Sequence, residues 1–268
     1  MGIKPVSEQL EYVSGDKHRS LQSQFKIMFA AEFDAIVNKR RSNRSYDPAV
    51  EVPDTVITKG LEQAILSPNS SNMQLWEFHW IKDPALKEHF HAICLNQSAA
   101  KTSKHLVAFV TRADLWKKHA DWNLNNVKAD IGDREPTKRE KRGLQYYSFI
   151  MPIAYRNDAL GISTLIRKIV CFVMGFKNPF MRIGGSRDQR VVVHKSCALA
   201  AQTFMLSMTA QGYDTCPMEG FDSLRARKAL NLPSGAEVGM IISVGKGTEA
   251  GIHGPRRRIP FEEVVIVH

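Results

Sequence analysis

The longest apolar pattern in the chain constrains its fold most. Residues Val191–Gln211 are rich in Ala and Met and predict one long helix. Gly212 follows, a residue type that suits the position after a helix end. An apolar stripe along this helix is formed by Leu199, Met205, Leu206 and Met208. We interpret the stripe as core or dimer interface rather than as a cofactor contact.

Shorter patterns alternate irregularly between helix and strand along the rest of the chain. Predicted helices cover Phe25–Lys39, Asp54–Leu66, Pro84–Cys94 and a short segment from Asp222-Ser223 to Leu230. Predicted strands cover Trp76–Ile81, His105–Thr111, Val238–Val244 and Val264–Val267. The irregular order favours an α+β domain over a doubly wound sheet.

The domain organisation follows from the absence of a Pro/Gly/Ser-rich linker. The 268 residues are 43% hydrophobic and 24% charged, which suits a globular chain with a substantial core. We expect an N-terminal arm at 1–24 and one domain at 25–268. Within it, residues from about 128 to 190 carry a charge run and then aromatic stretches, and they predict an insertion.

Cysteine usage and hydropathy bear on the compartment. Four scattered cysteines show neither CxxC nor zinc spacing, and the first ten residues lack the apolar core of a secretory signal. Arg167 and Lys168 interrupt the apolar stretch Gly161–Phe176, which leaves it short of the ~20 residues of a spanning helix. We expect a reduced, cytoplasmic protein without a membrane partner.

The net charge of +10 calls for an anionic partner or for none. Nucleic acid would explain a basic surface, but no helix-turn-helix, zinc-finger or RNP-like pattern occurs. We therefore expect no nucleic-acid partner and prefer anionic small molecules, with the remaining charges solvated. Likewise, His89 and His91 lie two apart in a helical pattern, on different faces, so no metal site is expected.

Two basic segments could bind one anion together. Arg40, Ser42 and Arg44 follow a predicted helix, and in extended chain their i, i+2, i+4 spacing places them on one side. Arg256 and Arg258 have the same spacing between two prolines. Guanidinium groups suit phosphate because their planar fork binds it bidentately. Taken alone, each segment could equally be a solvated basic surface.

Two loops complete the candidate site. Pro68–Trp76 is dense in small hydrogen-bonding side chains between a helix and a strand, a placement that often carries binding groups. Turn chemistry alone would also explain its Ser and Asn content. In the second loop, Cys216–Asp222, Gly220 allows the backbone N–H groups to approach a ligand closely.

Together these segments resemble the flavin-binding nitroreductase family. The matching motifs, in family order, are Arg-Arg-Ser-Asn-Arg at 40–44, Pro-Asn-Ser-Ser-Asn-Met-Gln-Leu-Trp at 68–76, Pro-Met-Glu-Gly-Phe-Asp at 217–222 and Arg-Arg-Arg-Ile-Pro at 256–260. Asn96 falls where the family commonly has a flavin-contacting Asn. The likeness covers roughly residues 25–125 and 190–268. It implies a mixed, mostly antiparallel sheet flanked by helices, with a helical insertion.

The resemblance also implies how FMN is held. Its phosphate and ribityl oxygens would be bound by Arg40, Ser42, Arg256 and Arg258. Its pyrimidine edge would face Arg44 and Asn96. The remaining cofactor contacts would come from Arg41, Asn69, Pro217 and Met218, with Pro68, Ser70 and Asn72 reaching in from a partner subunit. The backbone near Glu219 and Gly220 would lie at flavin N5. Two departures from the family are Leu75, where Pro is usual, and Ala99, where some members have a flavin-contacting Lys that Lys101 could replace.

The implied activity is a homodimeric FMN oxidoreductase with ping-pong kinetics. NAD(P)H would reduce the flavin, and an electron-poor acceptor such as a nitroaromatic or quinone would reoxidise it, with no catalytic side chain required. The alternative is an FMN-binding or nucleotide-sensing protein that does not turn over. The aromatics of 145–181 would either roof the flavin or pack on the partner subunit.

Overall fold

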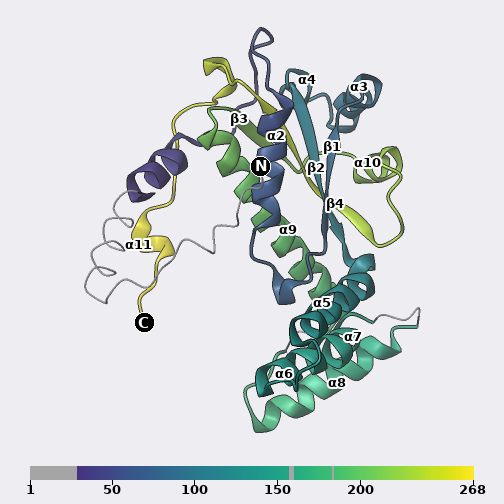
Figure 1. Ribbon diagram of the computed structural model, residues 1–268. Helices are drawn as coiled ribbons and strands as arrows, with labels where there is room; N and C mark the ends of the chain where they lie inside the picture. Colours follow the sequence, from purple (N-terminus) through teal and green to yellow (C-terminus); the bar gives the residue numbers. More distant parts are fainter. Residues whose placement is uncertain (1–28, 157–159, 183) are drawn as a thin grey trace. The chain divides into compact units, whose positions relative to one another are not determined.

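The computed structural model describes residues 29–156, 160–182 and 184–268 (Figure 1). The chain forms two compact units. The first unit is Met1–Arg40, of which 29–39 form a helix. The second unit, Arg41–His268, contains the sheet. The arm expected at 1–24, and the start of the helix expected at Phe25–Lys39, lie outside the described residues.

The second unit is built on an antiparallel sheet. Its strands are β1 (Trp76–Ile81), β2 (His105–Arg112), β3 (Asp214–Met218) and β4 (Ala236–Gly245), in the spatial order β1-β2-β4-β3. A bulge at Phe109/Val110 shifts the β2–β4 register. Strand β2 is buried along almost its whole length, because helices cover both faces of the sheet. The α+β class predicted from the sequence is confirmed.

One face of the sheet is covered by two helices in close contact, α2 (Asp54–Ile65) and α9 (Ser186–Ala210). Phe204 and Met208 of α9 are fully buried against β2 and α2. A Cβ at Gly60 of α2 would collide with both side chains, so glycine permits this close approach. By length and composition α9 could cross a membrane, but its apolar side faces this core.

The other face is covered by α3 (Pro84–Ile93), α4 (Ser98–Lys101) and α10 (Ser223–Ala229). Asp83 accepts a hydrogen bond from Leu86 N, and Asp222 accepts one from Arg225 N; each carboxylate caps its helix. Helices α2, α3 and α10 and strands β1 and β2 begin and end within one or two residues of the sequence predictions.

Three elements depart from those predictions. Helix α9 begins at Ser186, earlier than the predicted Val191, because Asp188 accepts from Gly185 N and caps a polar first turn. Strand β3 covers residues predicted as the start of a loop. The strand predicted at Val264–Val267 is wrong: α11 (Phe261–Val264) is one helical turn, and 265–268 pair with no strand among the described residues. Pro260 followed by two glutamates favours that helix start.

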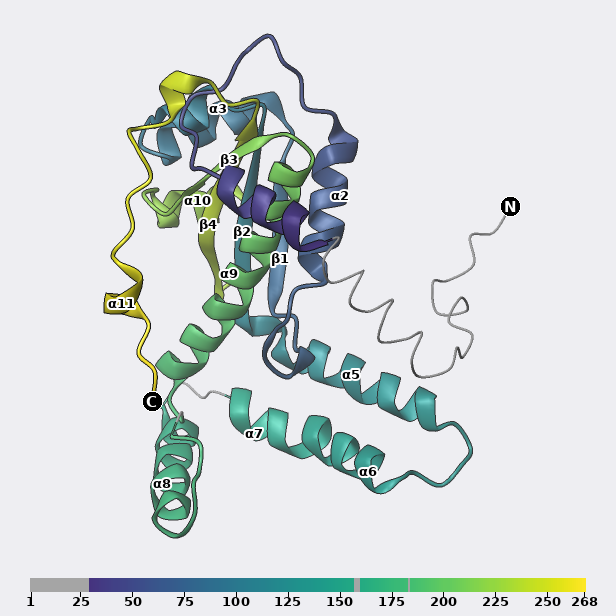
Figure 2. The same ribbon diagram turned by 90° about the vertical axis from the view of Figure 1, so that its left-hand side faces the viewer.

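A helical segment separates β2 from α9. It consists of α5 (Trp116–Ile131), α6 (Lys138–Gln145), a π-helical turn (Tyr146–Ile150), α7 (Met151–Tyr155) and α8 (Ile162–Lys177). Helix α5 starts before residue 128, where the sequence placed the insertion. Figure 2 shows α5, α6 and α7 packed together, with α8 beyond them. Met151 and Tyr155 form a third apolar core with Met73 and Leu75, next to the predicted 68–76 loop.

Candidate functional site

The two predicted basic segments are brought together by backbone pairing. Ser42 forms a parallel bridge with Thr215, at the start of β3. Arg44 N donates to Gly251 O at 2.9 Å, and the Arg41 guanidinium donates to Gly254 O at 2.9 Å. Gly254 lies two residues before Arg256, so about 7 Å of chain separates the pairing from the second basic segment.

Asn43 fixes this arrangement, and sequence reasoning did not single it out. Its side chain is 2% exposed; Nδ2 donates to Thr248 O at 2.9 Å and Oδ1 accepts from Ser45 N at 3.1 Å. A Cβ at Gly247 would collide with it. The signal was present: in an extended segment Asn43 must point opposite to Ser42 and Arg44, into the protein.

Three arginines of these segments, Arg41, Arg44 and Arg258, are available to an anion. Arg44 and Arg258 are exposed, and Arg41 and Arg256 are half-buried. Within the part of the chain that the structure describes, no carboxylate pairs with Arg41, Arg44 or Arg258; their hydrogen bonds go to backbone carbonyls. Arg40 ends the first unit, where its amide donates to Ile36 O at 2.9 Å.

Beneath the basic segment lies a buried tyrosine. The backbone N of Tyr46 donates to Thr102 Oγ1 at 3.1 Å, which ties the segment to the end of α4. The hydroxyl of Tyr46 lies 2.8 Å from Ser243 Oγ. Burial raises the pKa of Tyr46 far above its ordinary value, so the group is neutral and structural.

The Glu219–Gly220 segment follows the far end of β3. Pro217 and Met218, expected in a loop, are the last residues of that strand, and Glu219 and Gly220 are exposed beyond it. Proline is tolerated here because β3 is an edge strand. Gln97, which the sequence did not mark, donates from Nε2 to Gly220 O at 2.6 Å and to Cys94 O at 3.0 Å.

Asn96 lies between α3 and α4, next to Gln97. It is exposed and has a left-handed backbone (φ 57°), and its N–H donates to His91 O at the end of α3. Ala99 is buried, whereas Lys101 is exposed on the last turn of α4. The basic segments, the Asn96–Lys101 turn and the Glu219–Gly220 segment therefore form one connected region around β3.

A cavity of about 280 Å³ adjoins Glu219. Its walls come from α9, with His194 and Lys195, and from β4, with Gly239 and Met240. A Cβ at Gly239 would lie 3.3 Å from Phe109 O and 3.6 Å from His194 Nδ1. Glycine at this position therefore leaves more space in the cavity. The cavity offers space next to the segment expected at the flavin ring.

The predicted 68–76 loop has an unusual backbone. Ser71, Asn72 and Gln74 all have positive φ, between 48° and 57°, a conformation that costs non-glycine residues roughly 1 kcal/mol or more each. Pro68, Ser70 and Asn72 are exposed, and Asn69 is half-buried, with Oδ1 accepting from Gln74 N at 2.8 Å.

The helical segment holds this strained loop. Asn123 of α5 donates to Asn72 O at 2.9 Å and accepts from Asn72 Nδ2 at 2.8 Å. The hydroxyl of Tyr146 lies 2.6 Å from Ser71 Oγ, and Tyr147 donates to Ser71 O at 3.1 Å. In addition, a ring nitrogen of His119 donates to Met73 O at 2.7 Å. These two tyrosines therefore support the loop, whereas Phe149, Phe172 and Phe176 remain exposed.

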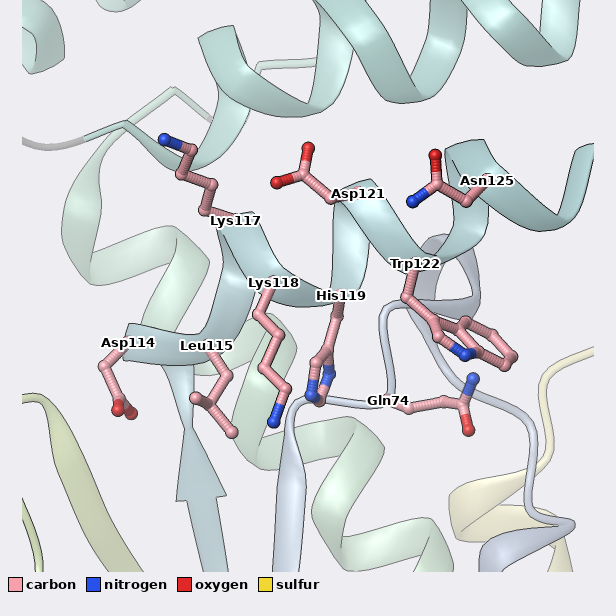
Figure 3. Close-up of a pocket in the computed structure, with 9 residues that line it drawn as sticks. All are labelled: Gln74, Asp114, Leu115, Lys117, Lys118, His119, Asp121, Trp122 and Asn125. Carbon is pink, nitrogen blue, oxygen red and sulfur yellow. The ribbon is translucent and has the colours of Figure 1, made fainter. Parts of the chain in front are cut away.

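A second cavity, of about 830 Å³, opens between this loop and α5 (Figure 3). Figure 3 shows the side chains of Trp122 and Gln74 lying close together at one end and those of Lys118 and His119 beside them. Trp122 is 53% exposed, so its ring is open to a ligand.

The loop and the basic segments lie at opposite ends of the sheet. Trp76, the last residue of the loop and the first of β1, pairs with Thr111, and Thr111 pairs with Glu237 at the start of β4. The basic segments instead adjoin Gly247, after the end of β4. The ten residues of β4 span about 30 Å. One chain therefore does not bring the two parts of the predicted site together.

Comparison with known proteins identifies the family of this chain. The family model described as "Nitroreductase family" matches residues 37–246. Protein DrgA of Synechocystis sp. is 28% identical over 238 residues, 87% of this chain and 94% of the relative. A protein of Thermus thermophilus named NADH dehydrogenase is 26% identical, over 85% of this chain and 92% of its own length.

The fold is shared with solved structures. A protein from Exiguobacterium sibiricum, solved in complex with FMN, superposes with a TM-score of 0.60 and 24% identity, over 88% of this chain and 97% of that one. The nitroreductase-like fold expected from the motifs is confirmed. Since the family model covers well over half of the sequence, this chain belongs to the nitroreductase family of oxidoreductases.

Proposed function

We propose that this chain is an FMN-dependent oxidoreductase that takes hydride from NAD(P)H and passes electrons to an electron-poor acceptor of the nitroaromatic or quinone type. The observation that carries the proposal is the pairing of 41–46 with 247–254, which sets two basic segments side by side at one end of β3. The Glu219–Gly220 segment lies at the other end of that strand.

The phosphate end of FMN fits the basic segments. Arg41, Ser42, Arg256 and Arg258 supply guanidinium and hydroxyl donors, and Arg40 directly precedes them. In the described part of the chain Arg41 and Arg258 have no carboxylate partner, and such guanidinium groups suit a phosphate dianion better than a neutral ligand. Asn43, bonded to Thr248 O and Ser45 N, keeps the two segments in register and thereby orients the donors.

The ring end fits the Glu219–Gly220 segment. The chemistry that FMN supplies when bound is hydride acceptance from NAD(P)H at N5 and return of the electrons to an acceptor. Gln97 holds Gly220 through a hydrogen bond to its carbonyl, and we infer that the N–H groups of Glu219 and Gly220 face the ring. Pro217 and Met218 form the strand edge that leads to it, and Arg44 and Asn96 supply polar groups for the pyrimidine edge.

We further propose a homodimer in which Pro68, Asn69, Ser70 and Asn72 serve the flavin of the partner subunit. The roughly 30 Å between this loop and the basic segments of the same chain supports that division. The cavity beside the loop would then complete the partner's site, with the ring of Trp122 available to stack on nicotinamide or acceptor. Successive use of that one space gives ping-pong kinetics. We place the protein in the reducing cytoplasm, since its cysteines are free thiols.

The decisive experiment is an anaerobic titration of the purified yellow protein with NADH and with NADPH. Bleaching followed by reoxidation with a nitroaromatic or a quinone is expected, with parallel lines in double-reciprocal plots. A flavin that binds but is not bleached by either nucleotide would favour the alternative, a non-turnover FMN-binding protein.

The assignment of the two basic segments to FMN has its own test. Arg44→Ala and Arg258→Ala should each remove a charge-assisted contact of roughly 1.5–3 kcal/mol, which weakens FMN binding about ten- to a hundredfold. Arg142→Ala, an exposed position on α6, is the matched control. Full FMN retention in both site variants would contradict the assignment.

A further inference from the structure

Helix α8 carries one buried arginine. Arg167, at its centre, is 7% exposed, and its guanidinium donates to Gly184 O at 3.1 Å and to Ile153 O at 3.2 Å. The same group also donates to Arg156 O and to Thr164 Oγ1. These bonds fix which side of the helix faces the rest of the domain.

The opposite side of α8 is apolar and open. Seven residues at helical spacing, each between 54% and 73% exposed, form one continuous stripe there: Ile162, Leu165, Ile166, Ile169, Phe172, Val173 and Phe176. In a surface helix of a globular protein such a stripe faces the core. Figures 1 and 2 show α8 at the edge of the helical segment, away from the sheet. An exposed apolar stripe of this size marks an interaction surface.

The charge of the surrounding segment indicates which kind of partner binds the apolar stripe of α8. Residues 159–187 contain no Asp or Glu but contain Arg167, Lys168, Lys177, Arg182 and Arg187. Lys168, Arg182 and Arg187 are exposed. A second copy of this chain, with its α8 on the stripe, would add the same positive charges, and like charges placed together oppose association. A bilayer containing anionic lipids offers hydrocarbon for the stripe and negative headgroups for the lysine and arginines.

We propose that α8 lies in the surface plane of a membrane containing anionic lipids, with its apolar stripe inserted and Lys168 and Arg182 at the headgroups. The sixteen residues of α8 span about 24 Å, which is short for crossing the hydrocarbon core but sufficient for lying in its interface. The sequence predicted no membrane partner because it excluded a spanning helix, and a surface helix does not need that length.

Vesicle flotation of the flavin-loaded full chain tests this proposal. The probes are vesicles of phosphatidylcholine alone and of phosphatidylcholine mixed with phosphatidylglycerol. We expect the protein to float with the mixed vesicles, more weakly in high salt, and to stay in solution with phosphatidylcholine alone. The double variant Ile169→Asp/Phe172→Asp changes only exposed positions and should reduce the bound fraction at least about tenfold.

Leu224→Asp, at a 77% exposed position on α10, is the matched control and should float like the wild type. Bound flavin and thermal unfolding establish that each variant is folded. Bleaching by NADH or NADPH is measured separately, so failure of the proposed enzymatic activity does not affect the result of the flotation test. Absence of flotation with either vesicle, or an equal loss in Leu224→Asp, would overturn the proposal. So would sedimentation in which the double variant alone becomes a monomer, because a second copy would then cover α8.

Discussion

Asn123 offers the sharpest test of how the 68–76 loop is held. Its side chain is 5% exposed and makes two reciprocal hydrogen bonds with Asn72, at 2.8 and 2.9 Å. Each of these hydrogen bonds contributes about 0.5–1.5 kcal/mol, so Asn123→Ala should remove roughly 1–3 kcal/mol of the free energy that stabilises the loop conformation. The three left-handed residues of the loop oppose that support by about 1 kcal/mol or more each. The loop should therefore leave its bound conformation for a substantial part of the time.

Two measurements follow from this balance. Because the proposed dimer uses the loop in the partner's flavin site, FMN affinity should fall by about five- to a hundredfold. The thermal midpoint should fall by roughly 2–4 °C per kcal/mol lost. Asn126→Ala, an exposed position on the same helix, controls for the change in helix composition. If Asn123→Ala bound FMN as tightly as Asn126→Ala does, the loop would not contribute to the flavin site.

Three further outcomes are expected. Gly247→Ala should displace Asn43 and weaken FMN binding while the chain stays folded; unaltered affinity in a fluorescence titration would contradict the role given to Asn43. Burial raises the pKa of Cys94 to about 11 and of Cys197 to about 12, so at pH 8 a thiol reagent should label them only after unfolding, as mass spectrometry can verify. A hydrogen bond from Arg190 lowers the pKa of Glu237 below the ordinary value of 4.5. At neutral pH this partly exposed ion pair should therefore stabilise the fold by roughly 0.2–1 kcal/mol. That contribution should be lost as the pH falls below 4.5. Glu237→Gln should flatten the acid limb of the stability curve, and an unchanged limb would show that the pair contributes nothing.

The sequence predicted those elements whose periodicity is local. The long helix α9 and strands β1 and β2 follow from apolar spacing alone. Strand β3 was not predicted, because Asp214 and Pro217 are residue types that disfavour strands. The proline is tolerated there because β3 lies at the edge of the sheet. The tail at 264–267 has strand-like residues but no partner strand among the described residues, so composition misled there.

The site divides in the same way. The i, i+2 spacing predicted that the basic side chains share one side, but not that Asn43 holds the two segments together through Thr248. The support of the 68–76 loop depends on contacts between residues about 50 to 75 positions apart, from Asn123, Tyr146 and Tyr147. No local pattern encodes such pairs, because they exist only after the helices have packed against the loop.

The separation of the basic segments and the loop along the sheet has a genetic counterpart. If every flavin site takes its basic segments from one chain and its loop from the other, a dimer of two chains with different substitutions contains one site without any substitution. In a mixed dimer of Arg258→Ala and Asn123→Ala chains, one site collects both defects and the other collects neither. Random assortment would therefore restore about a quarter of the wild-type sites, although each parent homodimer has none. Such intragenic complementation does not arise if every site is contained within one chain.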